Sequence, residues 1–222
     1  MRVAVRVKIC GLRSRAEVEV AVEAGARYVG MVFYPASPRH LSLADARWVA
    51  AAVPKRVARV ALTVNASDEE LDRLVEAVPL DMLQLHGRES PQRVAAIRDR
   101  FGLPVMKAIG VAVASDLAQV DAYAVVADQL LVDARPAPDA GRPGGNGLVF
   151  DWRLLEGRRW PIPWMLAGGL TPKNVAAAIQ LTGTAQVDVS SGVERRPGYK
   201  DPDLVRAFLA AALAAAPEAA LG

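Results

Sequence analysis

Short apolar runs alternate along this chain with longer stretches in which apolar residues recur every three or four positions. The short runs are typical of buried strands, and the longer period is typical of helices that bury one face. Eight rounds of this alternation follow one another. We expect strands at residues 5–9, 28–33, 57–64, 82–85, 105–108, 130–132, 164–167 and 186–189. We expect helices at residues 15–24, 43–52, 69–77, 91–101, 114–120, 152–155, 172–180 and 202–215.

Several expected helices carry a recognisable start. A serine followed three residues later by an acidic residue can bind the N–H groups that the first helical turn leaves without partners. Such pairs are Ser14 with Glu17, Ser42 with Asp45 and Ser67 with Glu70. Ser90 and Thr171 each precede a proline, which suits the first helical position. Gly25 and Gly102 are expected to end the first and fourth helices, because glycine adopts left-handed backbone angles easily.

Eight strand–helix rounds in 222 residues predict an α/β fold, a single-domain (β/α)8 TIM barrel over residues 1–222. Such barrels typically have about 250 residues, so this one should be compact. No linker or shift in composition divides the chain. A doubly wound open sheet is the structural alternative, but the glycine-rich motif typical of that fold does not follow the first strand.

Charge and composition restrict the partners. The net charge is only +3, and the basic residues are scattered among acidic ones, which argues against a nucleic acid partner. A single cysteine excludes an internal disulfide, as is usual in a reducing compartment. No apolar run reaches membrane-spanning length, and the first residues lack the apolar core of a secretory signal. We therefore expect a cytoplasmic protein with no membrane partner.

Polar and small residues follow the expected strands where those strands end. In a (β/α)8 barrel these positions meet at one mouth, which holds the active site. They are Cys10, Gly11, Arg39, Gln84, His86, Lys107, Gly110, Asp133, Arg135, Gly168, Gly169 and Asp188. Cys10 is the only thiol and is a candidate base or nucleophile. The alternative is a small buried core residue, since free cysteine is often buried.

The last two strand ends have the chemistry of an anion site. Gly168-Gly169 and Ser190-Ser191-Gly192 offer consecutive unhindered N–H groups together with hydroxyls. Either segment alone is equally well a tight turn or a helix cap. Barrels frequently bind phosphate with the loops after strands seven and eight, so the joint occurrence favours a phosphate site.

The strand ends also carry longer motifs. They are KICG at 8–11, GMVFYP at 30–35 with SPR at 37–39, QLHG at 84–87, GGNG at 144–147 before FDW at 150–152, AGGL at 167–170, and VDVSSGVE at 187–194. In this order and over almost the whole chain, they resemble the phosphoribosylanthranilate isomerase family of tryptophan biosynthesis. The AGGL segment alone is shared with other phosphosugar barrels.

The resemblance implies an enzyme that converts N-(5-phosphoribosyl)anthranilate into 1-(2-carboxyphenylamino)-1-deoxyribulose 5-phosphate, an Amadori rearrangement. It implies that Asp133 is the acid that protonates the furanose oxygen and that Cys10 is the base that removes the C2 proton. It further implies that Arg39 binds the anthranilate carboxylate, that the partner is a small phosphosugar, and that no cofactor or metal is needed.

Cys10 and Asp133 can fill these two catalytic roles only if their surroundings shift their ionisation. A free thiol has a pKa of about 8.5, so Cys10 needs a stabilised thiolate. Lys8 has the same strand parity as Cys10 and is expected to face it inside the barrel. Asp133 must hold a proton, which requires burial or a nearby negative charge. The alternative for Asp133 is an ordinary helix cap or a partner of Arg135.

Three further polar residues are expected at the substrate. Asp188 shares its parity with Ser190 and is expected to face the substrate nitrogen. Gln84 and His86 are expected either to contact the substrate or to form a hydrogen-bonded wall behind it. With only two histidines, the chain offers no set of imidazole ligands for a metal.

The segment from residue 134 to 148 is too long and too rich in glycine and proline for a minimal connection, and we expect it to act as a lid. Its Gly145 is a candidate phosphate-binding residue. Where the family usually has Gly-Lys, this chain has Gly147-Leu148. The phosphate contact of that lysine is therefore missing, and the backbone or Arg142 must replace it.

Three other functions compete with this interpretation. A related isomerase of histidine biosynthesis would need a carboxylate where Cys10 stands. A metal-dependent pentose-phosphate epimerase would need several histidine ligands, which the chain lacks. A non-catalytic phosphate-binding barrel would not need Cys10 and Asp133 together. The assembly state is open; we favour a homodimer because thermophilic relatives often associate.

Overall fold

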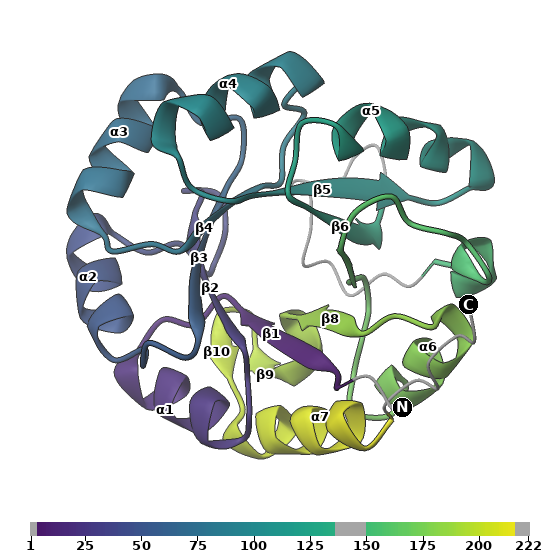
Figure 1. Ribbon diagram of the computed structural model, residues 1–222. Coiled ribbons are helices and arrows are strands. Elements are labelled where there is room, and N and C mark those ends of the chain that lie inside the picture. The colour runs from purple at the N-terminus through teal and green to yellow at the C-terminus, as the bar shows by residue number, and fades with distance from the viewer. Residues whose placement is uncertain (1–3, 136–149, 216–222) are drawn as a thin grey trace.

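The computed structural model describes residues 4–135 and 150–215 of the chain. Eight parallel strands close into a barrel, because each pairs with the next and β8 pairs back with β1 (Figure 1). The strands are β1 (Arg6–Cys10), β2 (Tyr28–Phe33), β3 (Ala58–Thr63), β4 (Met82–Leu85), β5 (Val105–Val111), β6 (Gln129–Ala134), β7 (Trp164–Leu166) and β8 (Gln186–Val189). The predicted (β/α)8 barrel is confirmed, and β2, β4 and β8 have the predicted bounds.

Helices surround the barrel on its outside (Figure 1). They are α1 (Arg15–Glu23), α2 (Leu43–Ala51), α3 (Asp68–Ala77), α4 (Pro91–Phe101), α5 (Val120–Ala124), α6 (Val175–Thr182) and α7 (Pro202–Ala214). Three shorter 3₁₀ turns are η1 (Ala114–Gln119), η2 (Trp152–Leu155) and η3 (Ser191–Val193). The helix expected at 114–120 is therefore a 3₁₀ turn that leads into α5, and the one expected at 152–155 is η2 alone.

The serine caps predicted from sequence are confirmed. The side chains of Ser14, Ser42, Ser67 and Ser90 each accept the N–H of the residue three positions on. Gly102 caps α4 in the left-handed conformation, and Gly25, with φ of 105°, follows the Ala24 cap of α1.

The predicted start at Thr171 is wrong. α6 begins only at Val175, after Asn174, whose Oδ1 accepts the Thr171 N–H at 2.7 Å and whose Nδ2 donates to the Gly169 carbonyl at 3.0 Å. These bonds extend the glycine loop by three residues, because the asparagine side chain replaces the first helical turn as a partner for the backbone.

A small antiparallel hairpin that the sequence analysis did not predict follows β8. Its strands are β9 (Glu194–Arg196) and β10 (Tyr199–Lys200), and Gly198 turns between them with φ of 82°. Lys200 pairs with Glu194 across the hairpin. The chain is thereby folded back over the end of β1 before α7 begins.

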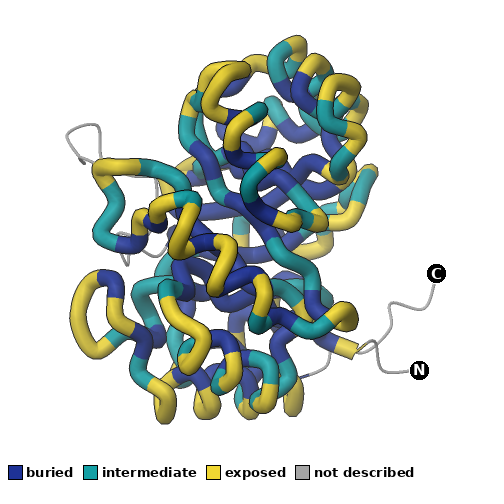
Figure 2. Tube along the Cα trace, turned by 90° about the vertical axis from the view of Figure 1, so that its left-hand side faces the viewer, coloured by how far each residue is buried: buried dark blue, intermediate teal, exposed yellow. Residues whose placement is uncertain are grey.

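The core has two layers. One apolar cluster contains residues from the strands and helices and fills the space between them. A second cluster contains strand residues, among them Met106, Leu131 and Met165, and no helix residue, so it lies inside the barrel. Buried positions accordingly run through the middle of the molecule and exposed positions along its outer turns (Figure 2). No helix in the described part of the chain is long and apolar enough to cross a membrane.

Candidate active site

Cys10 ends β1 and lies buried directly across from Gly30 of β2. A Cβ atom on Gly30 would lie 2.9 Å from the Cys10 Sγ, so only glycine leaves room for this thiol. The neighbouring strand therefore shapes the space in which the thiol lies.

Lys8 lies one strand repeat before Cys10 and points the same way. Its Nζ donates to Asp188 Oδ1 at 2.9 Å, and both residues are buried and face each other across β1 and β8. Burial alone would lower the pKa of Lys8, but the negative charges of Asp188 and Cys10 outweigh it and raise that pKa. The expectation that Lys8 lies beside Cys10 is therefore confirmed, and Lys8 stays charged.

Burial dominates the ionisation of Cys10 itself. It raises the pKa of the thiol above the ordinary value, although Lys8 and Lys200 oppose this effect. Asp188 acts in the same direction as burial. In the protein without substrate, Cys10 is thus a protonated thiol at neutral pH, held next to two cations that favour its ionised form.

Asp133 lies one residue before the end of β6, in a chain of three polar side chains. Its Oδ1 accepts the N–H of Ala134 at 2.8 Å, and its Oδ2 is 3.2 Å from His86 Nε2. His86 Nδ1 is in turn 2.9 Å from Gln84 Nε2. With that amide donating, the ring proton of His86 lies on Nε2 and points at Asp133. Gln84 and His86 thus form a hydrogen-bonded wall behind Asp133.

Arg135, the alternative partner expected for Asp133, pairs with another carboxylate. Arg135 forms its ion pair with Asp116, which also accepts the N–H groups of Ala112 and Val113. Gln84 Oε1 is buried and has no hydrogen-bond partner within the described residues. The amide of Gln84 can therefore turn over and accept a proton from His86 when the ring changes tautomer.

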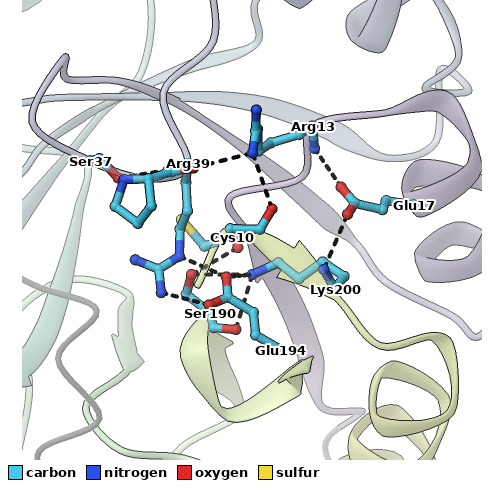
Figure 3. Close-up of polar contacts among 10 residues, drawn as sticks. Cys10, Arg13, Glu17, Ser37, Arg39, Ser190, Glu194 and Lys200 are labelled. Atoms are coloured by element: carbon cyan, nitrogen blue, oxygen red, sulfur yellow. Dashed lines mark hydrogen bonds and ion pairs between the residues drawn. The ribbon is translucent and has the colours of Figure 1, made fainter. Parts of the chain in front are cut away.

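Arg39, in the loop after β2, is buried and forms a bidentate pair with Glu194. Its Nε lies 2.7 Å from Oε1 and its Nη2 lies 2.8 Å from Oε2 (Figure 3). The side chain of Arg39 crosses over Gly11, where a Cβ atom would meet Arg39 Cδ at 2.5 Å. The guanidinium is therefore held at the end of β1, beside Cys10.

Lys200 completes this ionic group, and the sequence analysis gave neither Lys200 nor Glu194 a role. Its Nζ donates to Glu194 Oε1 at 2.8 Å and to the carbonyl and hydroxyl oxygens of Ser190 at 3.0 and 3.3 Å (Figure 3). The Pro197-Gly198 pair is a turn signal from which the hairpin was predictable, whereas the contacts of the Lys200 side chain were not.

The two candidate phosphate loops lie against each other. Gly168 and Gly169 have φ of 85° and 63°, and within the described residues no carbonyl accepts their N–H groups. A Cβ atom on Gly192 would collide with the Leu170 carbonyl, so the loop after β8 packs on the loop after β7. Ser191 begins η3 in this loop.

Other expected residues take different places. Ser190 directs its hydroxyl to the Cys10 carbonyl at 3.0 Å. Lys107 was expected at the mouth, but it lies on the opposite face of β5 from Met106 and binds Glu89 at 2.9 Å and the Gly87 carbonyl at 2.8 Å. Alternation along β5 directs it outward, where it holds the loop that follows His86.

Gly145, Arg142 and Leu148 lie outside the described residues, as does most of the expected lid. Among the residues that are described, no group of three or more histidine, cysteine, aspartate or glutamate side chains could hold a metal ion.

Comparisons with known proteins point to one family. The family model described as N-(5'phosphoribosyl)anthranilate (PRA) isomerase matches residues 7–211. The N-(5'-phosphoribosyl)anthranilate isomerase of Cereibacter sphaeroides is 64% identical over 208 residues, which cover 94% of this chain and 98% of that protein. The counterpart from Paracoccus denitrificans is 59% identical over 211 residues, 95% of this chain and 98% of that one.

Solved structures agree. The crystal structure of phosphoribosyl anthranilate isomerase from Thermotoga maritima has a TM-score of 0.84 and 38% identity, and the match covers 94% of this chain and 98% of that one. A complex of such an enzyme with reduced 1-(o-carboxyphenylamino)-1-deoxyribulose 5-phosphate matches with a TM-score of 0.82, 37% identity and the same coverage. On sequence and fold together, the chain belongs to the N-(5'-phosphoribosyl)anthranilate isomerase family.

Proposed function

We propose that this chain catalyses the rearrangement of N-(5-phosphoribosyl)anthranilate to 1-(2-carboxyphenylamino)-1-deoxyribulose 5-phosphate in tryptophan biosynthesis. The observation that carries the proposal is that Cys10 and Asp133 both lie at strand ends, of β1 and β6, at the mouth of a barrel of this family. A thiol beside a lysine and a carboxyl beside a histidine are groups able to exchange protons with a substrate held between them.

Asp133 acts as the acid. It gives a proton to the furanose oxygen, the C1–O bond breaks, and the substrate opens to a Schiff base. We place the donated proton on Oδ2, because Oδ1 accepts the N–H of Ala134, and a lone pair of Oδ2 remains to accept from His86. His86 and Gln84 hold this carboxyl in place and are the wall behind the sugar.

Cys10 acts as the base. As a thiolate it removes the C2 proton of the Schiff base, and the enolamine that results tautomerises to the ketone. Because burial keeps the free thiol protonated, the neighbouring cations must make the thiolate accessible. Asp188 lies on the other side of Lys8, and we place it near the substrate nitrogen.

The two ends of the substrate have their own sites in this proposal. Arg39 binds the anthranilate carboxylate, while Glu194 holds the guanidinium from its Nε and Nη2 edge. The phosphate binds at Gly168, Gly169, Ser190, Ser191 and Gly192. Two adjoining glycine loops support an anion there, together with the N–H groups of Gly168 and Gly169, which no carbonyl of the described residues accepts. Gly145 is the remaining candidate.

The wider properties follow the same proposal. Residues 1–222 act as one catalytic domain in the cytoplasm, without a cofactor, a nucleic acid or a membrane partner. A homodimer is the assembly that we favour; the Thermotoga maritima relative whose monomers have been solved, with 37% identity and a TM-score of 0.81, is described as dimeric.

One assay tests the function. Phosphoribosylanthranilate is generated enzymatically and mixed with the purified protein, and the loss of its fluorescence is followed. We expect rapid conversion that survives prolonged chelation of divalent ions. No conversion would overturn the proposal, and conversion restored only by a divalent ion would point to metal-dependent sugar-phosphate chemistry instead.

A further inference from the structure

Lys200 is an almost fully buried cation for which the reaction proposed above has no step. It stands 4% exposed on β10, and its backbone N–H is tied to Glu17 of α1 at 3.1 Å. Burial lowers the pKa of Lys200, and the negative charge of Glu194 opposes this. A charged group with this degree of burial needs partners. Among the described residues, the ammonium group of Lys200 binds Ser190, in the loop after β8, and Glu194, at the start of β9.

The contacts of Lys200 lead to Cys10. Its Nζ binds the Ser190 carbonyl and hydroxyl oxygens, and that hydroxyl donates to the Cys10 carbonyl at 3.0 Å (Figure 3). One residue therefore separates the ammonium group from the backbone of the base. Glu194 holds the ammonium from the other side at 2.8 Å.

The charges around Cys10 do not cancel. Lys8 and Asp188 form one pair, on β1 and β8. Arg39, Lys200 and Glu194 form a second group that holds two cations and one anion. The five residues together carry one net positive charge, and Arg13 and Glu17, which lie beside them in Figure 3, add one charge of each sign.

We propose that Lys200 is a positioning residue for the Cys10 base: through Ser190 it holds the end of β1, and its charge favours the thiolate. The proposal rests on Cys10 being the base, as proposed above. Lys8 and Lys200 reach this end of the barrel from different elements, Lys8 from β1 and Lys200 from β10, and both act on the thiol of Cys10. Electrostatic attraction from Lys200 opposes the effect of burial on the pKa of Cys10.

The single cysteine allows a direct test. Iodoacetamide reacts with the thiolate, so the rate of alkylation against pH reports the ionisation of Cys10 alone. In Lys200→Met the midpoint should rise by about one pH unit, the lower end of the effect of a nearby charge. Lys200→Arg keeps the charge and the donors and should restore most of the difference.

Lys107→Met is the matched control. Lys107 is also a buried lysine paired with a glutamate, but it points away from the barrel interior and makes its hydrogen bonds on the β4 side of β5. Its loss should leave the alkylation midpoint unchanged. If Lys200→Met does not fold, Lys200→Gln keeps a donor to Ser190 without the charge, and the midpoint should rise in the same way.

The pH dependence of kcat distinguishes a loss of thiolate in Lys200→Met from a loss of folded protein. In Lys200→Met, kcat near neutral pH should fall about tenfold and recover as the pH is raised, with KM nearly unchanged, because a rise of one unit in pKa reduces the thiolate about tenfold. An unchanged midpoint in a folded variant would overturn the inference. Alkylation needs no substrate, so a shifted midpoint in a protein without isomerase activity would refute the proposed function and leave the effect of Lys200 on the thiol intact.

Discussion

Replacing Asp133 by asparagine should remove the catalytic acid and leave the fold intact. Asparagine can keep the bond from the Ala134 N–H through its own Oδ1, now at 2.8 Å. Its Nδ2 would then replace Oδ2 at 3.2 Å from His86 Nε2, which accepts once the ring proton moves to Nδ1. Gln84 can bind that proton, because its Oε1, which has no partner among the described residues, is available after a turn of the amide.

The expected changes in stability and in kcat follow from these hydrogen bonds. With every hydrogen bond replaced, the free energy of unfolding should change by less than about 1 kcal/mol, the net worth of one such bond. The melting temperature should therefore move by less than about 4 °C. In contrast, kcat should fall by about 10² to 10⁴, the usual contribution of one general acid, because an amide does not release a proton at neutral pH.

Asp116→Asn provides the matched control. Asp116 Oδ2 accepts two backbone N–H groups, at 2.8 and 3.1 Å, while Oδ1 pairs with Arg135. An amide cannot accept at both ends, so this variant should lose about 1–3 kcal/mol of stability and keep most of its kcat. The two substitutions thus make opposite predictions for stability and for turnover.

Isotope exchange assigns the step. The open-chain product does not need ring opening, so exchange of its C1 hydrogens with solvent deuterium, which passes back through the enolamine, should persist in Asp133→Asn and vanish in Cys10→Ala. Nuclear magnetic resonance of the product in deuterium oxide measures both. Equal loss of exchange in the two variants, or more than about a tenth of normal turnover in Asp133→Asn, would refute separate acid and base roles.

Three other predictions follow from the same site. Cys10→Ala should lower kcat by about 10² or more at nearly unchanged KM, and alkylation should inactivate the enzyme unless a product analogue protects it. Arg39→Lys should chiefly raise KM for the anthranilate substrate, because a point charge cannot form the bidentate contact; an unchanged KM would move the carboxylate site elsewhere. Burial alone would raise the pKa of Glu194, but Arg39 and Lys200 hold that pKa below the ordinary 4.5. The ionised Glu194 should therefore stabilise the fold at neutral pH, and this stabilisation should be lost as the pH falls below 4.5 and Glu194 is protonated. Denaturant unfolding of Glu194→Gln should show a weaker loss between pH 5 and the acid limit, and an equal loss would exclude this origin.

Much of the barrel was predictable from the chain, because its signals are local. Apolar runs mark the strands, and the caps at Ser14, Ser42, Ser67 and Ser90 bind N–H groups only three residues away. The start of α6 was missed where a local competitor, Asn174, supplies the loop with a different partner. Short-range hydrogen bonds can be inferred from sequence as long as only one partner is within reach.

The rule that active-site residues of a barrel lie at the ends of its strands also located the two candidate catalytic residues. Cys10 and Asp133 lie at strand ends, and the parity of β1 puts Lys8 on the face of Cys10. The alternation of side chains has to be applied to each strand-end residue separately. Lys107 lies near the end of a predicted strand, but its side chain faces outward, away from the barrel interior. A position in the sequence indicates a strand end, whereas the side of the sheet depends on the alternation of the whole strand.

The sequence by itself determined the order of strands and helices, the single thiol and the family motifs, because these depend on neighbouring residues. Only the tertiary structure decided which charges meet. Glu194 reaches Arg39 across 155 positions, Asp188 reaches Lys8 across 180, and Ser190 joins Cys10 across another 180. These pairs form because closure of the barrel brings β8 beside β1 and the hairpin folds back over both. Burial then makes each charge depend on a partner that no local pattern reveals.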